Sequence, residues 1–364
     1  MPRSQKRILL LGDARQVHLR RWSQYLIDTG YDVITASLEP VDGVPGRSQR
    51  IRIPETLPDF LRYPMAVPAV RGIIRRFEPD LISAHFTPNY GLIAAMTGFH
   101  PWVLSTWGSD IMLLPERSAF HKKRTEFVIK NADSLTSDAA VMSDRLVALG
   151  AGRSRVITVP FGVDRNVFYP AERTETHDAP LVLSNRKLET IYNIDTIITA
   201  FTTVIRSLHG AKLTVAGSGS LSKRLHSDAA RTDAAPSIEF VGEVEHAGMP
   251  ALLRKHDIFV SIASSDTTSV SLLEAMACGL FPVTSDIPAT REWIRDGENG
   301  LLVPPRDAGA AARAIIDAWR NEDLRESARN QNAGLIEARA DWHSNMALVR
   351  NEFDRLIGPV ERGR

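Results

Sequence analysis

The sequence contains little cysteine and no long apolar run, and each absence narrows the class of protein. One cysteine, Cys278, occurs among 364 residues, so no internal disulfide can form and we expect a reducing, cytoplasmic compartment. The apolar run after the basic N-terminus ends at Gly12 and Asp13, which makes it too short for a signal peptide or a membrane span. Repeats of solenoid period and low-complexity tracts are also missing.

Neither a strong net charge nor a metal-binding motif is present. The net charge is +1 and 24% of the residues are charged, which gives no overall attraction to nucleic acid. No Cys/His cluster with zinc spacing occurs, and we expect no metal and no cofactor. The segment LGDARQ lacks the G-x-G-x-x-G turn of a dinucleotide site, so a dinucleotide-dependent oxidoreductase is a weak alternative.

The chain alternates short apolar runs with longer helical patterns in both halves. Strands are expected at residues 7–12, 31–37, 50–54, 79–86, 101–108, 133–137 and 155–162, and again at 180–186, 212–217, 237–242, 258–263 and 281–285. Helical patterns lie between most of these strands and continue at 308–319, 324–332 and 341–358, while a glycine turn is expected between 212–217 and 237–242. This alternation predicts an α/β fold of two doubly wound Rossmann-like domains that face each other across a cleft.

The pattern lapses between residues 167 and 179, which are rich in charge and have no apolar period. We therefore expect a first domain at 1–166, a linker at 167–179, a second domain at 180–342 and a final helix at 343–364. The apolar stripe of that helix allows it to cross back to the first domain or to pack within the second.

The stretch from Ser264 to Asp286 combines two carboxylates with the start of an apolar helix. Asp266 and Glu274 stand eight residues apart. A helix that begins near Ser269 would direct its first amides toward a phosphate; these are the amides of Thr268, Ser269 and Val270. Glu274, about one turn further on, would accept hydrogen bonds from sugar or ribose hydroxyls. An ordinary N-cap also explains the local pattern, but the flanking strands favour a ligand site.

Several segments follow one another in an order that is specific when they are taken together. They are PFGVD at 160–164, NRKLE at 185–189, VAGSGS at 215–220, FVGEVEHAGMPALLRKHDIFVS at 240–261, DTTSVSLLEAMACGLFPVTSD at 266–286 and DGENGLLVPPRD at 296–307. This set resembles glycosyltransferase family 4, the retaining glycosyl transferases of group 1 with the GT-B fold. In the first half the resemblance is looser and rests on LLLGD, DLISAHF and STWGSD.

The resemblance implies a role for each matching residue. Asp266 to Glu274 matches the family's Glu-x7-Glu signature, in which Glu274 would bind the ribose and Asp266 the hydroxyls of the transferred sugar. Arg186 would neutralise the diphosphate leaving group. The remaining donor-binding positions are the three amides named above, Gly12, Gly217, Lys187, and Gly242, Glu243 and Val244 beside the nucleobase.

Three positions depart from the family pattern. The first signature glutamate is Asp266, one methylene shorter. The lysine six positions after the arginine is Tyr192, which brings no positive charge; Lys187 is either its substitute or a solvent-facing neighbour.

The third departure is Trp107, which stands where the family has the histidine of a His-Gly-x-Asp stretch. Asp110 is retained there. His85 and His18 are candidates for the acceptor-side role, and a structural role is the alternative for each. Because His85 ends a strand at the ligand-binding edge, we predict His85 and Asp110, with Arg186 and Asp266, as catalytic.

The resemblance implies a metal-independent, retaining, hexosyltransferase-type enzyme that uses a UDP- or GDP-sugar. Its expected acceptor is a carbohydrate or a lipid-linked molecule, in cell-surface glycan or glycolipid synthesis. No Asp-x-Asp pair occurs, which argues against the metal-dependent glycosyltransferase architecture. A nucleotide-sugar binding protein without turnover is an alternative because of Tyr192 and Trp107, and a GT-B epimerase or phosphorylase is another.

Two basic helical patterns in the first half bear on localisation. Their side chains either contact an anionic membrane surface, which would make the protein peripheral at the inner face of the membrane, or form a solvated face. The residues are Arg71, Arg75, Arg76, Lys122, Lys123, Arg124 and Lys130.

Overall fold

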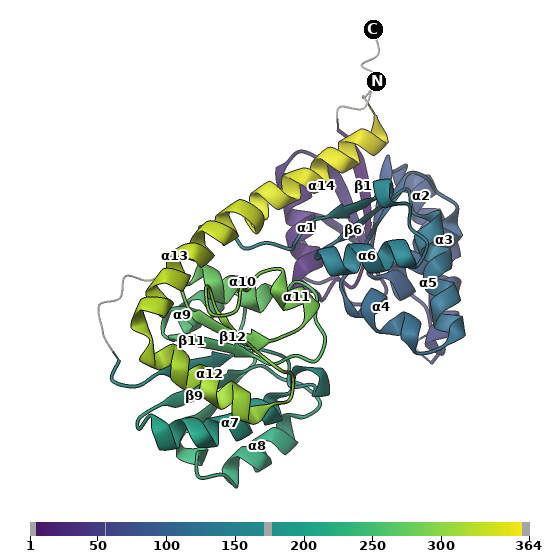
Figure 1. Ribbon diagram of the computed structural model, residues 1–364. Coiled ribbons are helices and arrows are strands. Elements are labelled where there is room, and N and C mark those ends of the chain that lie inside the picture. Colours follow the sequence, from purple (N-terminus) through teal and green to yellow (C-terminus); the bar gives the residue numbers. More distant parts are fainter. Residues whose placement is uncertain (1–4, 55, 171–176, 359–364) are drawn as a thin grey trace. The chain divides into compact units, whose positions relative to one another are not determined.

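The computed structural model describes residues 5–54, 56–170 and 177–358, and the chain forms two compact units (Figure 1). Unit 1 comprises Met1–Val159 together with Met346–Arg364, and unit 2 comprises Pro160–Asn345. Each unit is built on its own parallel sheet with its own buried core. The predicted fold class of two doubly wound domains is therefore confirmed.

The sheet of unit 1 has seven parallel strands in the order β3-β2-β1-β4-β5-β6-β7. The strands are β1 (Arg7–Leu11), β2 (Asp32–Ser37), β3 (Arg47–Arg50), β4 (Leu81–His85), β5 (Trp102–Ser105), β6 (Ser134–Ser137) and β7 (Val156–Thr158). The strand order reverses between β1 and β4, and ligands of doubly wound folds bind beyond the carboxyl ends of the strands at such a reversal.

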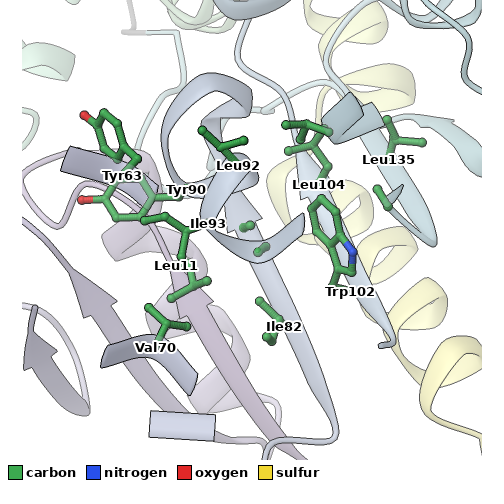
Figure 2. Close-up of a cluster of buried hydrophobic side chains, with 14 of the residues drawn as sticks. Leu11, Tyr63, Val70, Ile82, Tyr90, Leu92, Ile93, Trp102, Leu104 and Leu135 are labelled. Carbon is green, nitrogen blue, oxygen red and sulfur yellow. The ribbon is translucent and has the colours of Figure 1, made fainter. Parts of the chain in front are cut away.

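Helices cover this sheet and complete its core. They are α1 (Val17–Asp28), α2 (Asp59–Phe77), α3 (Leu92–Thr97), α4 (Ser109–Met112), α5 (Ala119–Asn131), α6 (Ala140–Ala148) and the last helix, α14 (Trp342–Ile357). Figure 2 shows Leu11, Ile82 and Leu104 of the central strands among the buried side chains of the core, with Val70 of α2 and Ile93 of α3. The central strands β1, β4 and β5 are mostly apolar because both of their faces are covered.

Strand β3 does not lie where the apolar alternation placed it. The prediction was residues 50–54, but the strand is Arg47–Arg50 and pairs with Ile34–Ser37 of β2. It is the edge strand and its residues are largely exposed, so nothing requires an apolar pattern there. Ile51, which is 2% exposed, enters the core directly after the strand and produced the misleading signal.

The sheet of unit 2 has six parallel strands in the order β10-β9-β8-β11-β12-β13. The strands are β8 (Leu181–Ser184), β9 (Lys212–Ala216), β10 (Ile238–Gly242), β11 (Ile258–Ser261), β12 (Phe281–Ser285) and β13 (Leu301–Val303). The helices are α7 (Ile194–Ser207), α8 (Ser222–Ala230), α9 (Met249–Arg254), α10 (Val270–Ala277), α11 (Pro288–Arg291), α12 (Ala308–Arg320) and α13 (Glu322–Arg339). Here the order reverses between β8 and β11.

The boundary between the units lies at Val159 and Pro160, before the predicted end of the first domain at residue 166. Val163 and Phe168 are 1% and 2% exposed in a core cluster of unit 2. The Val163 amide also donates to the Ala340 carbonyl (2.7 Å). The start of the predicted linker is therefore packed chain of unit 2, while residues 171–176 lie outside the described residues.

The last helix, α14, belongs to both units. Its first turn is bound in unit 2, where the Trp342 amide donates to Val163 and the Asn345 side chain to Pro160. From Met346 onward it belongs to unit 1, where Phe353 is fully buried beside Trp22. The helix thus begins within unit 2, and its residues from Met346 onward are grouped with unit 1.

A helix must be both long and apolar to span a membrane. Over the described residues, no helix combines the length and the hydropathy that spanning a membrane requires.

Candidate functional site

The strand-order reversal of unit 2 gathers the polar residues that the sequence singled out. Arg186 follows β8, Asp266 follows β11, and α10 begins at Val270, so all three stand at carboxyl ends of the central strands. The predicted start of this helix near Ser269 is confirmed, with Ser269 as its N-cap. Parallel strands place a ligand-binding edge at this position.

Arg186 is the centre of this cluster. Its Nη2 donates to Asp266 Oδ2 (2.6 Å), and its Nη1 donates to Ser271 Oγ (2.8 Å) and to Ser269 Oγ. The Arg186 and Asp266 side chains are only 10% and 17% exposed, which strengthens the ion pair. The guanidinium also lies over the Tyr192 ring, 4.3 Å from its centroid.

The N-terminus of α10 is tied to the same cluster. Ser269 Oγ accepts a hydrogen bond from the Leu272 amide (3.3 Å), and the Thr267 amide donates to Asp266 Oδ1 (3.0 Å). Ser269 is thus the N-cap of α10, as the alternative of an ordinary N-cap predicted. Its Oγ also accepts a hydrogen bond from Arg186. The positive end of the helix dipole and the guanidinium adjoin one another, which creates a site suited to an anion.

Glu274 lies one turn further along α10 and is only 6% exposed. His246 Nδ1 is 3.7 Å from Glu274 Oε1, and the His246 ring packs against Phe168 at 5.3 Å between centroids. A buried carboxylate beside an anion site is suited to accept hydrogen bonds from hydroxyl groups of the same ligand.

The glycine turn after β9 packs against the loop that bears Arg186. Gly217 has φ of +140°, its amide donates to the Gly242 carbonyl (2.6 Å), and a Cβ at Gly217 would lie 2.5 Å from the Arg186 carbonyl oxygen. Only glycine therefore permits this approach. Next to it, Glu243 accepts a hydrogen bond from Ser218 Oγ (3.0 Å).

Two further predicted positions of unit 2 lie outside the arginine cluster. Val244 is partly buried against the core cluster that contains Phe168. Lys187 is exposed and interacts electrostatically with Glu189. Lys187 therefore does not bring into the Arg186 cluster the positive charge that Tyr192 lacks.

In unit 1 the corresponding reversal brings Gly12 and His85 together. A Cβ at Gly12 would lie 2.8 Å from a methyl carbon of Leu19 and 3.3 Å from the His85 Cβ. His85 is 1% exposed, contacts Ser83 Oγ through Nε2 (3.2 Å), and packs edge-on against Trp22 at 4.7 Å. Burial, with a smaller effect from His18, lowers the pKa of His85 to about 3, so its imidazole is neutral.

Asp110 is also buried in unit 1, at 1% exposure. Its Oδ2 accepts hydrogen bonds from the Thr87 amide (3.0 Å) and hydroxyl (2.8 Å), and its Oδ1 accepts one from the Trp107 amide (3.0 Å). Burial raises the pKa of Asp110, although these hydrogen bonds partly oppose the shift. Asp110 fixes the loops that follow β4 and β5.

Sequence reasoning missed two residues of the site, Ser271 and His246. Ser271 stands two residues after Ser269, where a helix start near Ser269 already placed it in the first turn. His246 lies within the FVGEVEHAG segment. For metal binding, the described residues include no group of three or more His, Cys, Asp or Glu side chains that could hold an ion.

Comparison with protein families covers both units. Residues 168–334 match the family model "Glycosyl transferases group 1", and residues 7–139 match "Glycosyl transferase 4-like". The glycogen synthase of Mycobacterium tuberculosis is 28% identical over 223 residues, which are 60% of this chain and 53% of that protein. The phosphatidyl-myo-inositol mannosyltransferase of the same species is 30% identical over 223 residues, or 59% and 57%. The match thus spans a little over half of each relative.

Solved structures match over almost the whole chain. Sucrose-phosphate synthase from Thermosynechococcus elongatus superimposes with a TM-score of 0.84 at 18% identity, covering 97% of this chain and 99% of that one. Anabaena HepE in complex with UDP-glucose superimposes with a TM-score of 0.81 at 15% identity, covering 96% and 100%. These are GT-B glycosyltransferases. With both family models matched in succession, the chain belongs to glycosyltransferase family 4, the glycosyl transferases of group 1, and has the GT-B fold.

Proposed function

We propose that this protein transfers a sugar from a nucleotide-diphosphate donor to an acceptor hydroxyl. The observation that carries the proposal is the Arg186 cluster at the start of α10, with the buried Glu274 one turn beyond it. A cation and a helix N-terminus together suit a diphosphate, and the two carboxylates suit hydroxyl groups on either side of it.

In this proposal the diphosphate binds the amides at the helix start and the Arg186 guanidinium. The donor phosphate then competes with Asp266 for Arg186, which frees the Asp266 carboxylate for hydroxyls of the transferred sugar. Glu274 binds the ribose, and the backbone from Gly242 to Val244 holds the base. The amides are those of Thr268, Ser269 and Val270, and Gly217 keeps the Arg186 loop in place.

The chemistry follows from where charge develops. As the bond between the anomeric carbon and the phosphate oxygen breaks, its electron pair goes to the diphosphate, which Arg186 and the helix N-terminus stabilise. The acceptor oxygen attacks from the same face and gives its proton to the departing phosphate, so the anomeric configuration is retained. In this scheme protein groups alone provide the positive charge, which makes the reaction metal-independent.

The ligands bound in solved complexes of a structural neighbour support a nucleotide-sugar donor. HepE has been solved with UDP and with UDP-glucose. By this likeness we propose a UDP-sugar first and a GDP-sugar second. A carbohydrate or lipid-linked acceptor, within cell-surface glycan or glycolipid synthesis, completes the proposal.

On the acceptor side we propose positioning roles. Gly12 lets the chain after β1 pass close to His85, and His85 presents a neutral ring at the strand-order reversal of unit 1. Because both oxygens of Asp110 already accept hydrogen bonds, Asp110 orders the two loops and does not act as a base.

A thermal-shift screen over nucleotides, nucleotide diphosphates and their sugars tests the proposal. A ligand that binds only the folded protein raises the melting temperature. We expect UDP or GDP and their sugars to raise it in the wild type and in Lys212→Ala, a control at the exposed start of β9, but not in Arg186→Ala. No shift with any nucleotide diphosphate would contradict the donor assignment. Donor binding without hydrolysis or transfer would favour the non-catalytic binding protein.

A further inference from the structure

A pocket of about 580 Å³ lies in unit 1, whereas the proposed donor site belongs to unit 2. It is formed where the loops after β4 and β5 meet α5. One part of its lining is apolar and another is cationic. The residues that matter are Phe86, Leu113 and Phe120, which are apolar, and Arg117 and Arg124, which are cationic.

The apolar side of this pocket is open to solvent. Phe120 is 60% exposed and Leu113 is 37% exposed. Further along α5, Phe127 is 45% exposed and lies seven residues from Phe120, on the same helix face. The Arg124 guanidinium lies over the Phe120 ring, 5.8 Å from its centroid. Alternating aromatic and cationic side chains are typical of surfaces that contact anionic amphiphiles.

The charge of the pocket is positive. Asp110 lines it, but the hydrogen bonds from Thr87 and Trp107 engage both of its oxygens inside the protein. Glu116 next to the pocket pairs with Arg145. Arg117 and Arg124 therefore dominate the charge that a ligand would meet.

The other predicted basic helix, α2, does not line the pocket with its arginines. Arg71 of α2 donates to the carbonyls of Thr97 (3.1 Å) and Met96 (2.9 Å), and it thereby caps α3. Arg76 contacts Gln49 (3.4 Å). Among the basic residues predicted from sequence, Arg124 is the one that lines the pocket.

The backbone at the floor of the pocket is unusual. Phe86 has φ of +75°, in the left-handed region that side chains other than glycine rarely adopt. A π-helical turn, Phe86–Gly91, follows directly after β4. Such backbone is energetically unfavourable and occurs mostly at ligand sites.

We propose that this pocket binds a lipid that carries a phosphate group. The phosphate contacts Arg117 and Arg124, and the chain lies along Phe120 and Leu113 with the remainder in the membrane. Where that lipid is the acceptor, or the anchor of the acceptor, the inference rests on the proposed function. Binding of such a lipid would place the protein at an anionic membrane surface.

The test is calorimetric titration of the full chain with monomeric dodecyl phosphate. Inorganic phosphate and dodecyl maltoside serve as probes for the anion alone and the chain alone. Arg117→Glu and Phe120→Ser change exposed residues that line the pocket, and Lys122→Glu is a control of equal charge change on the same helix outside it. We expect each lining variant to weaken dodecyl phosphate binding by about tenfold and the control to match the wild type.

Three results would overturn the inference: no binding of dodecyl phosphate, equal binding by Arg117→Glu and wild type, or inorganic phosphate binding as tightly as dodecyl phosphate. Titration with UDP in parallel separates the two proposals. Binding of dodecyl phosphate with the expected variant pattern, but no UDP binding, would retain the lipid pocket and remove the donor site. UDP binding together with any of the three results would retain the donor site and remove the lipid pocket.

Discussion

At the scale of single residues, Tyr192 shows what a departure from a family pattern can mean. From sequence, the residue represented only a lost positive charge. In the structure its ring lies under Arg186 and shields one face of the guanidinium, while Asp266 and Ser271 bind its edge. In the proposed complex, where a donor phosphate displaces Asp266, this contact would keep Arg186 oriented.

Tyr192→Leu should therefore weaken UDP binding by about fivefold, because a cation–π contact contributes about 0.5–2 kcal/mol. Tyr192→Phe keeps the ring and should bind as the wild type does. Calorimetric titration measures both. Equal affinities for all three proteins would show that the ring does not position Arg186.

His85 gives a prediction for stability against pH. Its pKa is about 3 in the folded protein and 6.5 ordinarily, so the unfolded chain takes up its proton first as the pH falls. The contribution of neutral His85 to the free energy of unfolding is therefore fully present above pH 6.5 and is lost progressively as the pH falls toward 3.

The variant His85→Phe keeps an aromatic ring in contact with Trp22 and Trp107 and removes the titration. Between pH 7 and 5 the wild type should lose up to about 2 kcal/mol more unfolding free energy than this variant. Urea unfolding at the two pH values measures the difference. Parallel loss in both proteins would mean that His85 titrates normally.

Which site residues could be predicted from the sequence depended on how far apart along the chain the interacting residues lie. Asp266 and Glu274 were predictable because a helix start and a spacing of eight residues define their geometry locally. The bond from Arg186 to Ser271 joins residues 85 apart, and only the sheet order brings them together. His246 was missed for the same reason.

At the scale of elements, apolar periodicity found the buried strands and missed those with little buried surface. β3 is a polar edge strand, β13 has three residues, and α8 buries only Leu225 and Ala229. Such elements owe their position to neighbouring strands and helices, which periodicity does not record.

The glycine turn after β9 carries the prediction at this scale. In Gly217→Ala the new Cβ would lie 2.5 Å from the Arg186 carbonyl oxygen at a φ of +140°, so the loop that bears Arg186 must shift. We expect UDP affinity to fall by about tenfold or more, with the protein still folded and less stable by about 1–3 kcal/mol. Gly334→Ala, where nothing lies within 4 Å, is the matched control. Unchanged affinity in Gly217→Ala would show that the turn does not position Arg186.

At the scale of the whole molecule, α14 makes unit 1 discontinuous in sequence, because unit 1 contains both ends of the chain. The sequence predicted its amphipathic stripe but could not say which core the stripe enters. Phe353 is fully buried in unit 1, and Asp354 accepts hydrogen bonds there from Lys6 (2.8 Å) and Tyr31 (2.6 Å). Unit 1 thus depends on residues from the opposite end of the chain.

Phe353→Ala should destabilise unit 1 by about 3–5 kcal/mol, as expected for a large buried side chain. Leu348→Ala, on the same helix but 49% exposed, should change stability by about 0.5 kcal/mol at most. Urea unfolding followed by tryptophan fluorescence reports both. Similar small effects in the two variants would mean that α14 is not part of the core of unit 1.

The central claim is that Arg186 and the start of α10 hold a diphosphate. Titration of the wild type and of Arg186→Ala with UDP and with UMP tests it most directly, because the two ligands differ by one phosphate. We predict that the wild type binds UDP about tenfold or more tightly than UMP and that Arg186→Ala loses this preference. An Arg186→Ala protein that keeps the full preference for UDP would contradict the account.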